Sequence, residues 1–292
     1  MMYLRLSRDN MKKIFAVLSL LMFQQLAFAQ AVPVLMVPSD SRSMAMGGID
    51  MQRDADNMDI QAFYGMWAPK SADNKMFGGN AFFRIGKDLG VSLEGRVFKD
   101  KPYDIISEQG MATGESFSPS DKIFGAGVFY DITEVFSVGL KGRVVASAIA
   151  ADAKGSAFCA DLSAAYNGDV FSATLALRNV GSKISYGKAS YSLPSMAALQ
   201  GSVRPLEGLT AAAEIDYLLA GRLMAALGVE YGIADIVFLR AGYHYCSSVK
   251  GIPTYASLGL GLQFAGVRLE ASYLTASKTL DNTLLFSLGY AF

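Results

Sequence analysis

The last nine residues of the chain place large apolar side chains at alternate positions and end on an aromatic residue. Side chains of a strand point alternately to its two faces, so the even-numbered residues from Leu284 to Phe292 would form one apolar face. The other face would hold Leu285 and then the small or weakly polar Ser287, Gly289 and Ala291. This pattern predicts the closing strand of a membrane β-barrel, with lipid on one side and the lumen on the other. We expect Tyr290 and Phe292 to act as the signal that the barrel assembly machinery recognises.

The same alternation recurs from residue 77 onward, in segments whose length suits a tilted strand crossing a bilayer. The predicted strands are 77–86, 90–98, 123–131, 135–146, 156–167, 170–178, 196–204, 209–216, 223–232, 236–244, 255–264, 266–275 and 283–292. Bacterial barrels have even strand numbers, so a further strand is expected at Ile60 to Trp67. We therefore predict an all-β fold, a transmembrane antiparallel up-and-down β-barrel of about fourteen strands, with twelve as the alternative.

Short and long connections alternate between these strands. Short turns such as Gly86-Lys87-Asp88 consist of residues that favour tight turns. The longer links run over about 99–122, 147–155, 179–195, 217–222, 245–254 and 276–282. This alternation is typical of a barrel with short periplasmic turns and longer outer loops.

The N-terminal residues resemble a secretory signal. Met11-Lys12-Lys13 precedes a short apolar run, Ile14 to Phe23, and Ala27-Phe28-Ala29 forms a small-residue cleavage site. After residue 30 no uncharged apolar run reaches the roughly 18 residues of a spanning helix. We predict a signal peptide over 1–29, cleaved after about Ala29, a periplasmic or lumenal plug-like segment over 30–59 and the barrel over 60–292. An N-terminal membrane anchor is the alternative. The expected location is the outer membrane of a Gram-negative bacterium, with lipid as a partner.

The period of two also separates the charged residues of the strands from the apolar ones. Large apolar residues such as Leu93, Leu140 and Leu260 fall on the predicted lipid face. The predicted lumen charges are Glu94, Arg96, Lys141, Arg143, Asp161, Glu214, Asp216, Glu230, Arg240, Arg268 and Glu270. Both signs occur on neighbouring strands, whereas a selective pore more often has a ring of one sign. We expect a lumen closed by paired side chains and the N-terminal segment, with an open diffusion pore as the alternative.

Composition and motifs exclude several functions. Lys and Arg total 26 and Asp and Glu total 26, so no net field favours nucleic acid. The single histidine, His244, has no acidic ligand at metal spacing, and we interpret it as a polar group at a strand end. No catalytic motif is present, so no enzyme and no cofactor is expected. Cys159 and Cys246 are interpreted as two small buried or lumen-facing thiols, with a disulfide as the alternative.

Two sequence blocks resemble the PorV/PorQ family of outer-membrane proteins. The first runs from Val37 to Gly48 and matches the family opening P-x-D-x-R-x-x-G-M-G-G at Pro38, Asp40, Arg42, Met46, Gly47 and Gly48. Met44 or Ala45 stands where the family has its first glycine. The second block, Leu177 to Gly187 followed by Leu193-Pro194, is similar to the family loop N-x-G-x-K-I-x-Y … L-P.

The resemblance implies a FadL-like fourteen-stranded barrel associated with the type IX secretion system. The protein would then be a non-enzymatic binding or scaffold component that contacts secretion-system subunits or exported proteins. Candidate partner residues on the two longest links are Tyr103, Phe117, Asn179, Gly181, Lys183, Tyr186 and Pro194. The alternative is a FadL-like transporter of hydrophobic small molecules, with residues 37–48 as a movable plug and Phe82 and Phe98 among the side chains lining its path.

Overall fold

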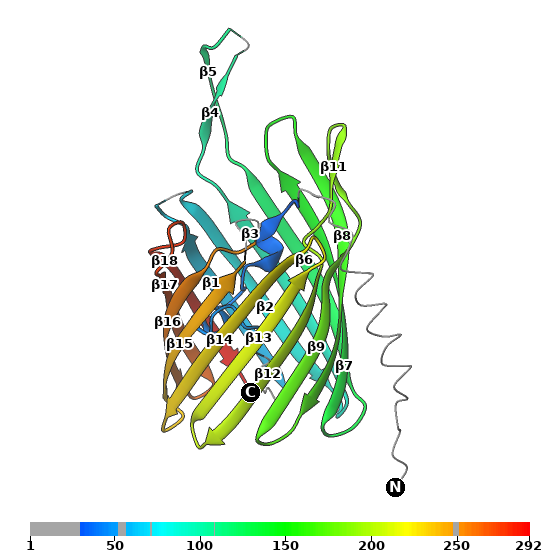
Figure 1. Cartoon of the computed structure of the whole chain (residues 1–292), viewed down its shortest axis with the longest axis vertical. Coiled ribbons are helices and arrows are strands. Elements are labelled where there is room, and N and C mark those ends of the chain that lie inside the picture. The colour runs from blue at the N-terminus through cyan, green and yellow to red at the C-terminus, as the bar shows by residue number, and fades with distance from the viewer. Residues whose placement is uncertain (1–29, 52–56, 71, 108, 248–250) are drawn as a thin grey trace.

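The computed structural model describes residues 30–51, 57–70, 72–107, 109–247 and 251–292 (Figure 1). The predicted signal peptide lies outside these residues. Fourteen antiparallel strands form a closed barrel, in which each strand pairs with its neighbours in the chain and β1 pairs with β18. The predicted fold is therefore confirmed, and the alternative of twelve strands is wrong.

The barrel strands differ from the predicted segments by only a few residues at their ends. They are β1 (Met58–Trp67), β2 (Asn74–Ile85), β3 (Leu89–Lys99), β6 (Ser120–Asp131), β7 (Phe136–Ala148), β8 (Lys154–Asn167), β9 (Phe171–Gly181), β12 (Met196–Leu206), β13 (Leu209–Leu218), β14 (Arg222–Ile233), β15 (Val237–Cys246), β16 (Tyr255–Phe264), β17 (Val267–Thr275) and β18 (Thr283–Ala291). β1 begins inside the segment predicted as plug-like, two residues before Ile60.

The two longest links contain secondary structure that the sequence pattern did not predict. The link after β3 forms a hairpin of β4 (Tyr103–Ile106) and β5 (Ala112–Phe117), which rises above the barrel (Figure 1). The link after β9 forms a hairpin of β10 (Ile184–Tyr186) and β11 (Ala189–Tyr191) at the same end. We call this end of the barrel the upper end. The opposite end, which carries the short turns, is the lower end.

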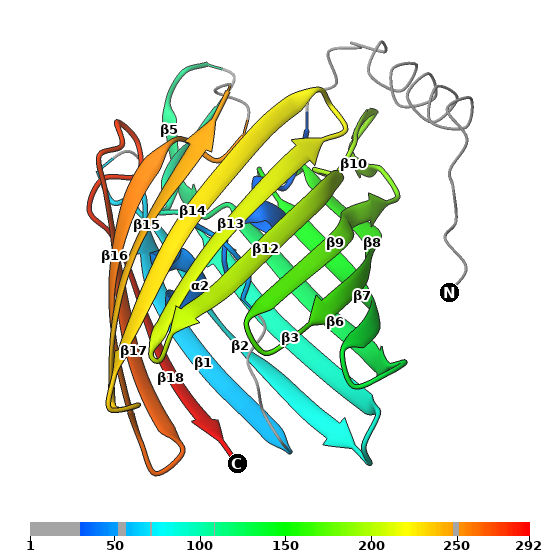
Figure 2. The same ribbon diagram turned by 60° about the horizontal axis from the view of Figure 1, so that its bottom comes forward.

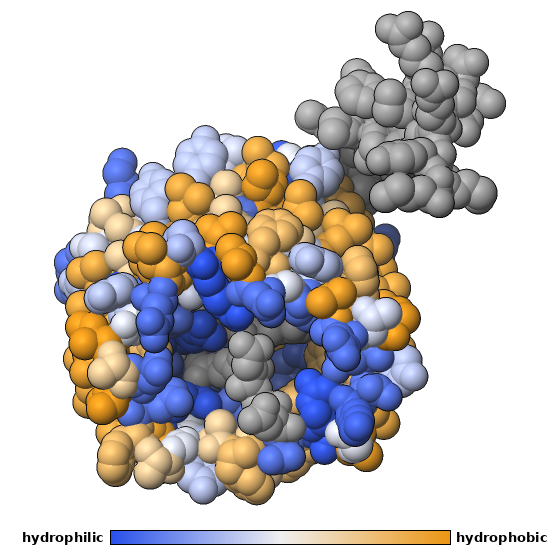
Figure 3. Space-filling model, turned by 90° about the horizontal axis from the view of Figure 1, so that it is seen from below, coloured by the Kyte–Doolittle hydropathy of each residue, from blue (hydrophilic) through white to orange (hydrophobic). Residues whose placement is uncertain are grey.

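The alternation of side chains along each strand separates the outer wall from the lumen. On β18, Leu285 is fully buried while its neighbour Phe286 is 49% exposed. The outer wall carries large exposed apolar side chains, as expected for contact with lipid. Figure 3, seen from below, shows hydrophobic residues over much of this wall and hydrophilic residues around the lower opening. Among the described residues, no helix is long and apolar enough to cross a membrane.

The N-terminal segment, residues 30–51, lies inside the barrel. It begins at the upper end, where the backbone N–H of Ala31 donates to the carbonyl of Ser192 over 3.0 Å. It then forms the short 3-10 helix η1 (Pro33–Met36) and the one-turn helix α2 (Ser41–Ala45). Figure 2 shows α2 within the ring of strands, where it contacts β15 to β18.

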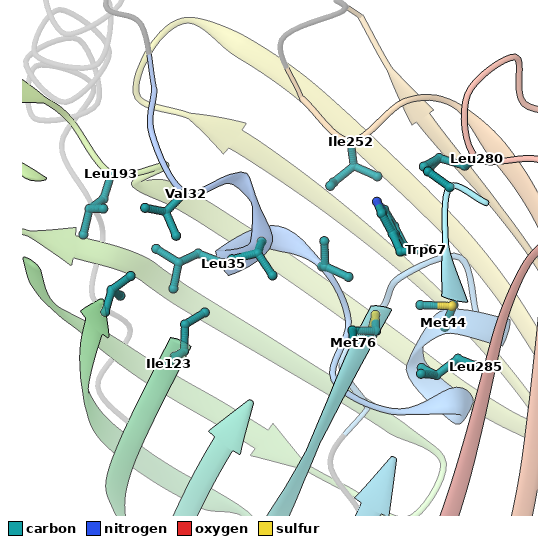
Figure 4. Close-up of a cluster of buried hydrophobic side chains, with 14 of the residues drawn as sticks. Val32, Leu35, Met44, Trp67, Met76, Ile123, Leu193, Ile252, Leu280 and Leu285 are labelled. Carbon is teal, nitrogen blue, oxygen red and sulfur yellow. The ribbon is translucent and has the colours of Figure 1, made fainter. Parts of the chain in front are cut away.

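The hydrophobic core of the molecule lies in the upper half of the lumen. Val32, Val34, Leu35 and Val37 of the N-terminal segment are buried there. They share one cluster with side chains of the wall and the upper links, including Trp67, Met76, Ile123, Leu193, Ile252 and Leu280 (Figure 4). This upper apolar cluster closes the barrel with the chain's own residues.

Candidate functional site in the barrel lumen

The motif from Pro38 to Gly48 folds as a compact turn of helix with a cap at each end. Asp40 is the N-cap of α2, and its side chain accepts from the backbone N–H of Ser43 at 2.9 Å and from the Ser43 hydroxyl at 2.7 Å. After α2 the chain turns through Gly47 and Gly48, whose φ angles are +79° and +97°. Such angles favour glycine, which explains why both motif glycines stand here.

Three glycines of the barrel wall let this turn lie directly on the strands. Gly228 on β14, Gly242 on β15 and Gly259 on β16 have no side chain to hold the segment away, and together we call them the glycine seat. A Cβ on Gly228 would lie 2.6 Å from the carbonyl oxygen of Met46. A Cβ on Gly242 would collide with the nitrogen of Gly47, and one on Gly259 with the side chain of Ala45. The backbone of the segment and the backbone of the wall are therefore in direct contact.

Hydroxyl groups of the wall hold the same turn by its backbone. The N–H of Ser41 donates to Ser287 Oγ at 3.0 Å, and Ser41 Oγ donates to the carbonyl of Leu285 at 2.8 Å. Ser257 Oγ donates to the carbonyl of Ala45 at 2.8 Å and accepts from the N–H of Gly47 at 3.2 Å. Three of these bonds satisfy backbone groups of the segment that a five-residue helix leaves without internal partners: the N–H of Ser41, the carbonyl of Ala45 and the N–H of Gly47.

Arg42 joins the segment to a buried chain of charges. Its guanidinium makes two bonds to Glu230, from Nε at 2.9 Å and from Nη2 at 2.7 Å. Glu230 also accepts from Arg240 Nε at 2.5 Å, and Arg240 Nη2 lies 3.1 Å from Glu270. A forked contact of this kind is the strongest form of ion pair that arginine makes. The sequence predicted Arg42 as a motif residue but did not predict its partner.

Two further groups of charges lie on the inner wall. Glu94 lies 3.3 Å from Lys141 and 2.6 Å from Arg143, and Arg143 lies 2.5 Å from Asp161. Arg178 makes two bonds of 2.9 Å to Glu214, and its Nη1 lies 3.6 Å from Asp216.

All eleven predicted lumen charges thus face inward. Several of their ion pairs join different strands: Arg268 of β17, for example, pairs with Asp59 of β1 at 2.6 Å. The sequence analysis did not assign Asp59 and Arg178 to the lumen. Asp59 fell in the segment predicted as plug-like, and Arg178 fell in the block that resembles a family loop.

A cavity of about 660 Å³ occupies the lumen below the upper apolar cluster. Its lining reaches from Leu35 and Val37 of the N-terminal segment to Lys87, Thr133 and Glu134 in the lower turns. Figure 3 shows the hydrophilic residues that surround the lower opening of the lumen. In the part of the chain that the structure describes, the lumen therefore has an apolar, filled upper part and, below it, a cavity lined by both polar and apolar side chains.

Arg96 lies where these two parts meet. Its side chain is buried, and Nη1 donates to the carbonyl of Val37 at 2.8 Å. It lines the large cavity and also a small gap among Val34, Val37 and Ile123. Arg96 thus holds the N-terminal segment at the boundary of the two parts. Of the aromatic residues predicted to line a path, Phe82 borders the cavity, whereas Phe98 packs against the upper apolar cluster.

Asp50 follows the motif and projects into the cavity. Its side chain is exposed there, and no ion pair within 4.0 Å joins it to another described residue. Enclosure by the barrel raises the pKa of this carboxyl, while Lys141 and Arg178 act in the opposite direction.

The surroundings of His244 and of the two cysteines indicate that these side chains have a structural role. The His244 ring is buried and stacked on Tyr255, with centroids 5.0 Å apart. Among the described residues there is no group of three or more His, Cys, Asp or Glu side chains that could hold a metal ion. Cys159 is buried and Cys246 half-buried, and neither forms a disulfide, so the alternative of a disulfide between them is wrong.

Most candidate partner residues of the second sequence block, Leu177 to Gly187 with Leu193-Pro194, form contacts within this protein. Asn179 forms a bulge in β9 at φ +59°, donates to the carbonyl of Pro194 at 3.2 Å and accepts from Arg143 at 2.7 Å. A side chain on Gly181 would collide with β8, and the Tyr186 hydroxyl donates to Ser147 at 2.7 Å. Lys183 also interacts with another group of the protein. This motif ties the β10–β11 hairpin to the barrel.

The remaining predicted residues lie at the two ends of the barrel. Tyr103 and Phe117 pair across the β4–β5 hairpin, with ring centroids 5.8 Å apart, and Tyr103 is 43% exposed. Phe292 lies beside Tyr290 at the lower end of the seam between β1 and β18. Its carbonyl accepts from the N–H of Met58 at 2.9 Å, and its N–H donates to the Met58 carbonyl at 3.1 Å.

No protein-family model and no curated protein matches the sequence. Solved structures do match the fold. The toluene transporter TodX of P. putida is 13% identical with a TM-score of 0.62, over 88% of this chain and 99% of that chain. The toluene transporter TbuX of Ralstonia pickettii is 9% identical with a TM-score of 0.59, over 88% of this chain and 99% of that one.

The monoaromatic hydrocarbon channel CymD is 12% identical with a TM-score of 0.56, over 88% of this chain and 98% of that chain. At identities of 9–13% the likeness shows the fold alone.

Proposed function

We propose that this protein is a FadL-like outer-membrane channel for small hydrophobic molecules, which its own N-terminal segment closes. The carrying observation is the upper apolar cluster, in which Val34, Leu35 and Val37 fill the space that an apolar ligand would occupy. Ligand sites are usually apolar with a few placed polar groups, and Arg96 is such a group at the edge of this one. The names of the solved neighbours, two toluene transporters and a hydrocarbon channel, support the same class of solute.

The N-terminal segment has two parts with different roles in this proposal. The part from Ser41 to Gly48 is bonded to the wall and lies on the glycine seat. The part from Val32 to Val37 is held by apolar packing, the Arg96 bond and the bond from Ala31 to Ser192. A solute would displace the second part, while the first keeps the segment attached. The outer membrane is the proposed location because the apolar outer wall suits lipid and the neighbours are outer-membrane channels.

Solute flux into proteoliposomes tests this proposal. Replacing Val34, Leu35 and Val37 by serine removes the apolar contacts of the closing part, and we expect faster entry of toluene than with the natural protein. Replacing the exposed Ile106 and Met111 of the β4–β5 hairpin by serine is the matched control, and it leaves entry unchanged. A folded triple-serine protein with no gain in toluene entry contradicts the proposal. So does a large, stable conductance of the natural protein in single-channel recording.

A second candidate is a PorV/PorQ-type scaffold of type IX secretion. The β4–β5 hairpin favours it, since this hairpin stands above the barrel and exposes Tyr103, Ile106 and Met111. Aromatic and methionine side chains are enriched where proteins bind each other. Pull-down from solubilised outer membranes, with the hairpin intact or replaced by a short turn, tests this candidate: a secretion component lost with the hairpin supports it, and no specific protein in either case counts against it.

A further inference from the structure

A group of lysines, which we call the lysine row, lies on the outer wall of the barrel at its upper end. Its members are Lys75 on β2, Lys99 on β3, Lys122 on β6 and Lys154 on β8. All four are exposed, and each faces away from the lumen, as Lys75 does between the buried Asn74 and Met76. In the upper halves of the described barrel strands, these lysines are the charged residues that face outward, so the outer wall there carries charge of one sign.

The strand register brings the lysine row together. Lys75 and Lys99 stand directly opposite each other on β2 and β3. The same line of partners continues from Lys99 through Ser120 of β6 and Ala148 of β7 to Lys154. Neighbouring strands are about 4.8 Å apart, and the lysine side chain is long and flexible. Across the small Ser120 and Ala148, the ammonium groups can therefore reach a common anion.

The described protein supplies no partner for these charges. Like charges that stand directly opposite each other destabilise a sheet, as Lys75 and Lys99 do here. The acids of the adjoining links, Asp73, Asp100 and Asp152, form no ion pair within 4.0 Å with the lysine row in the described parts of the chain. Other lysines are paired: Lys70 lies 2.7 Å from Asp281, and Lys141 lies 3.3 Å from Glu94. The lysine row thus presents positive charge to whatever surrounds the barrel.

Exposed aromatic side chains lie directly below the lysine row on the same wall. Phe77 follows Lys75 by two residues on β2, and Phe124 follows Lys122 by two residues on β6. Phe158 of β8 lies in the same cross-strand line as Phe124, two strands away. The wall of β2 to β8 therefore joins a basic upper edge to an apolar area, which complements a molecule with an anionic head and apolar chains.

The other side of the barrel has a different edge. Near their upper ends, β13, β15 and β17 carry the outward-facing tyrosines Tyr217, Tyr245 and Tyr273. Tyrosine is a common residue at the membrane–water boundary of barrels and carries no charge there. The described strands β12 to β18 have no outward-facing lysine at this level. The lysine row is therefore a local patch on β2 to β8 and not a ring that surrounds the barrel.

We infer that the lysine row binds the phosphate group of a membrane lipid, whose acyl chains lie over Phe77, Phe124 and Phe158. Two or more ammonium groups would donate charge-assisted hydrogen bonds to the phosphate oxygens, which also relieves the repulsion between Lys75 and Lys99. Basic clusters at a membrane surface attract anionic lipid headgroups in this way. A soluble phosphate would make no use of the apolar area below. The inference concerns the outer surface of the barrel and goes beyond the proposed channel.

Native mass spectrometry of the full chain tests the inference. The protein is released from neutral detergent micelles that hold equal amounts of dilauroylphosphatidate and dilauroylphosphatidylcholine. Both lipids have the same acyl chains, but the choline group of the second covers its phosphate and cancels its charge. We expect at least about fivefold more bound phosphatidate than bound phosphatidylcholine. Inorganic phosphate in large molar excess over the lipids leaves this preference in place.

Two double variants locate the site. One carries Lys75→Gln and Lys99→Gln, and the other carries Lys122→Gln and Lys154→Gln. We expect each to bring the two lipids close to equal binding, and the second keeps the test valid if the first does not fold. The matched control carries Lys188→Gln and Lys278→Gln, which remove the same charge from exposed positions in two upper links, and it keeps the preference for phosphatidate.

Equal binding of the two lipids by the natural protein overturns the inference, as does a full preference for phosphatidate in the folded lysine-row variants. Loss of the preference in the control variant also overturns it, because net charge alone would then decide the binding. If inorganic phosphate abolishes the preference, the site takes phosphate without its lipid and the inference is wrong. Toluene flux is a separate measurement, so none of these outcomes bears on the proposed channel.

Discussion

The backbone nitrogen of Gly47 lies so close to Gly242 of β15 that no side chain fits between them. This contact joins the N-terminal segment to the barrel wall without any intervening side chain. It makes the position of the segment depend on the identity of single wall residues, and it separates the anchored part of the segment from the part that fills the upper lumen.

Gly242→Ala should push the anchored turn away from the wall. The new methyl group would collide with Gly47, and such overpacking costs about 1–3 kcal/mol. We expect a lower unfolding temperature, measured by the heat-induced shift of the folded barrel on detergent gels, and a rise in conductance. Gly201→Ala is the control because a Cβ there meets nothing closer than 3.8 Å. An unchanged unfolding temperature in Gly242→Ala would show that the turn is not fixed by this contact.

Glu230→Gln should destabilise the barrel more than Arg42→Ala. Glu230 bonds both Arg42 and Arg240, so its neutralisation leaves two arginines with an excess of buried charge, at a cost of about 3–5 kcal/mol. Loss of Arg42 leaves Glu230 still paired with Arg240, and we expect a cost of about 1–3 kcal/mol. Urea titration of the reconstituted barrel measures both. A larger loss of unfolding free energy in Arg42→Ala than in Glu230→Gln would contradict the role of Glu230 as the shared partner of Arg42 and Arg240.

Asn179→Ala should release the β10–β11 hairpin. Asn179 has a φ of +59°, and its side chain bonds both Arg143 and Pro194. The left-handed conformation alone costs alanine about 1–2 kcal/mol. We expect faster proteolysis of residues 182–195 on intact cells. Asn179→Gly tolerates the backbone angle and isolates the loss of the amide, so equal protease resistance in both variants and the natural protein would refute the role of Asn179.

Deletion of Phe292 should impair membrane insertion. Its backbone exchanges hydrogen bonds with Met58 at the lower end of the β1–β18 seam, and its ring lies beside Tyr290. The measurement is the fraction of heat-modifiable barrel in isolated outer membranes. Phe117→Ala, which removes an aromatic ring of the β4–β5 hairpin and leaves the seam intact, is the control. Normal insertion without Phe292 would leave the aromatic terminus without its assigned part in assembly.

The strands and their two faces could be predicted because side chains facing the lipid and side chains facing the lumen alternate along each barrel strand. Leu284 to Phe292 and the recurrence of that pattern led to fourteen strands, all of which are present. The inward position of residues such as Glu94 and Arg240 followed from the same period. The hairpins within 99–122 and 179–195 could not be found this way, since β10 and β11 have three residues each and no repeating face.

The candidate site was less accessible to sequence reasoning, because it depends on contacts between distant segments. Arg42 and Glu230 are 188 residues apart, and the local sequence around either residue does not indicate that the two form an ion pair. Gly228, Gly242 and Gly259 look like ordinary small residues of strands until the turn at Met46 and Gly47 is placed on them.

The upper apolar cluster contains Trp67, which is the single tryptophan of the entire chain. Trp67 is 8% exposed and shares the cluster with Val34 and Leu35 of the N-terminal segment. The protein thus has its own fluorophore in the closure of its lumen. If the proposed channel opens by departure of residues 32–37, water would reach this ring and its emission would shift to longer wavelength, so the proposed opening could be followed in real time without any label.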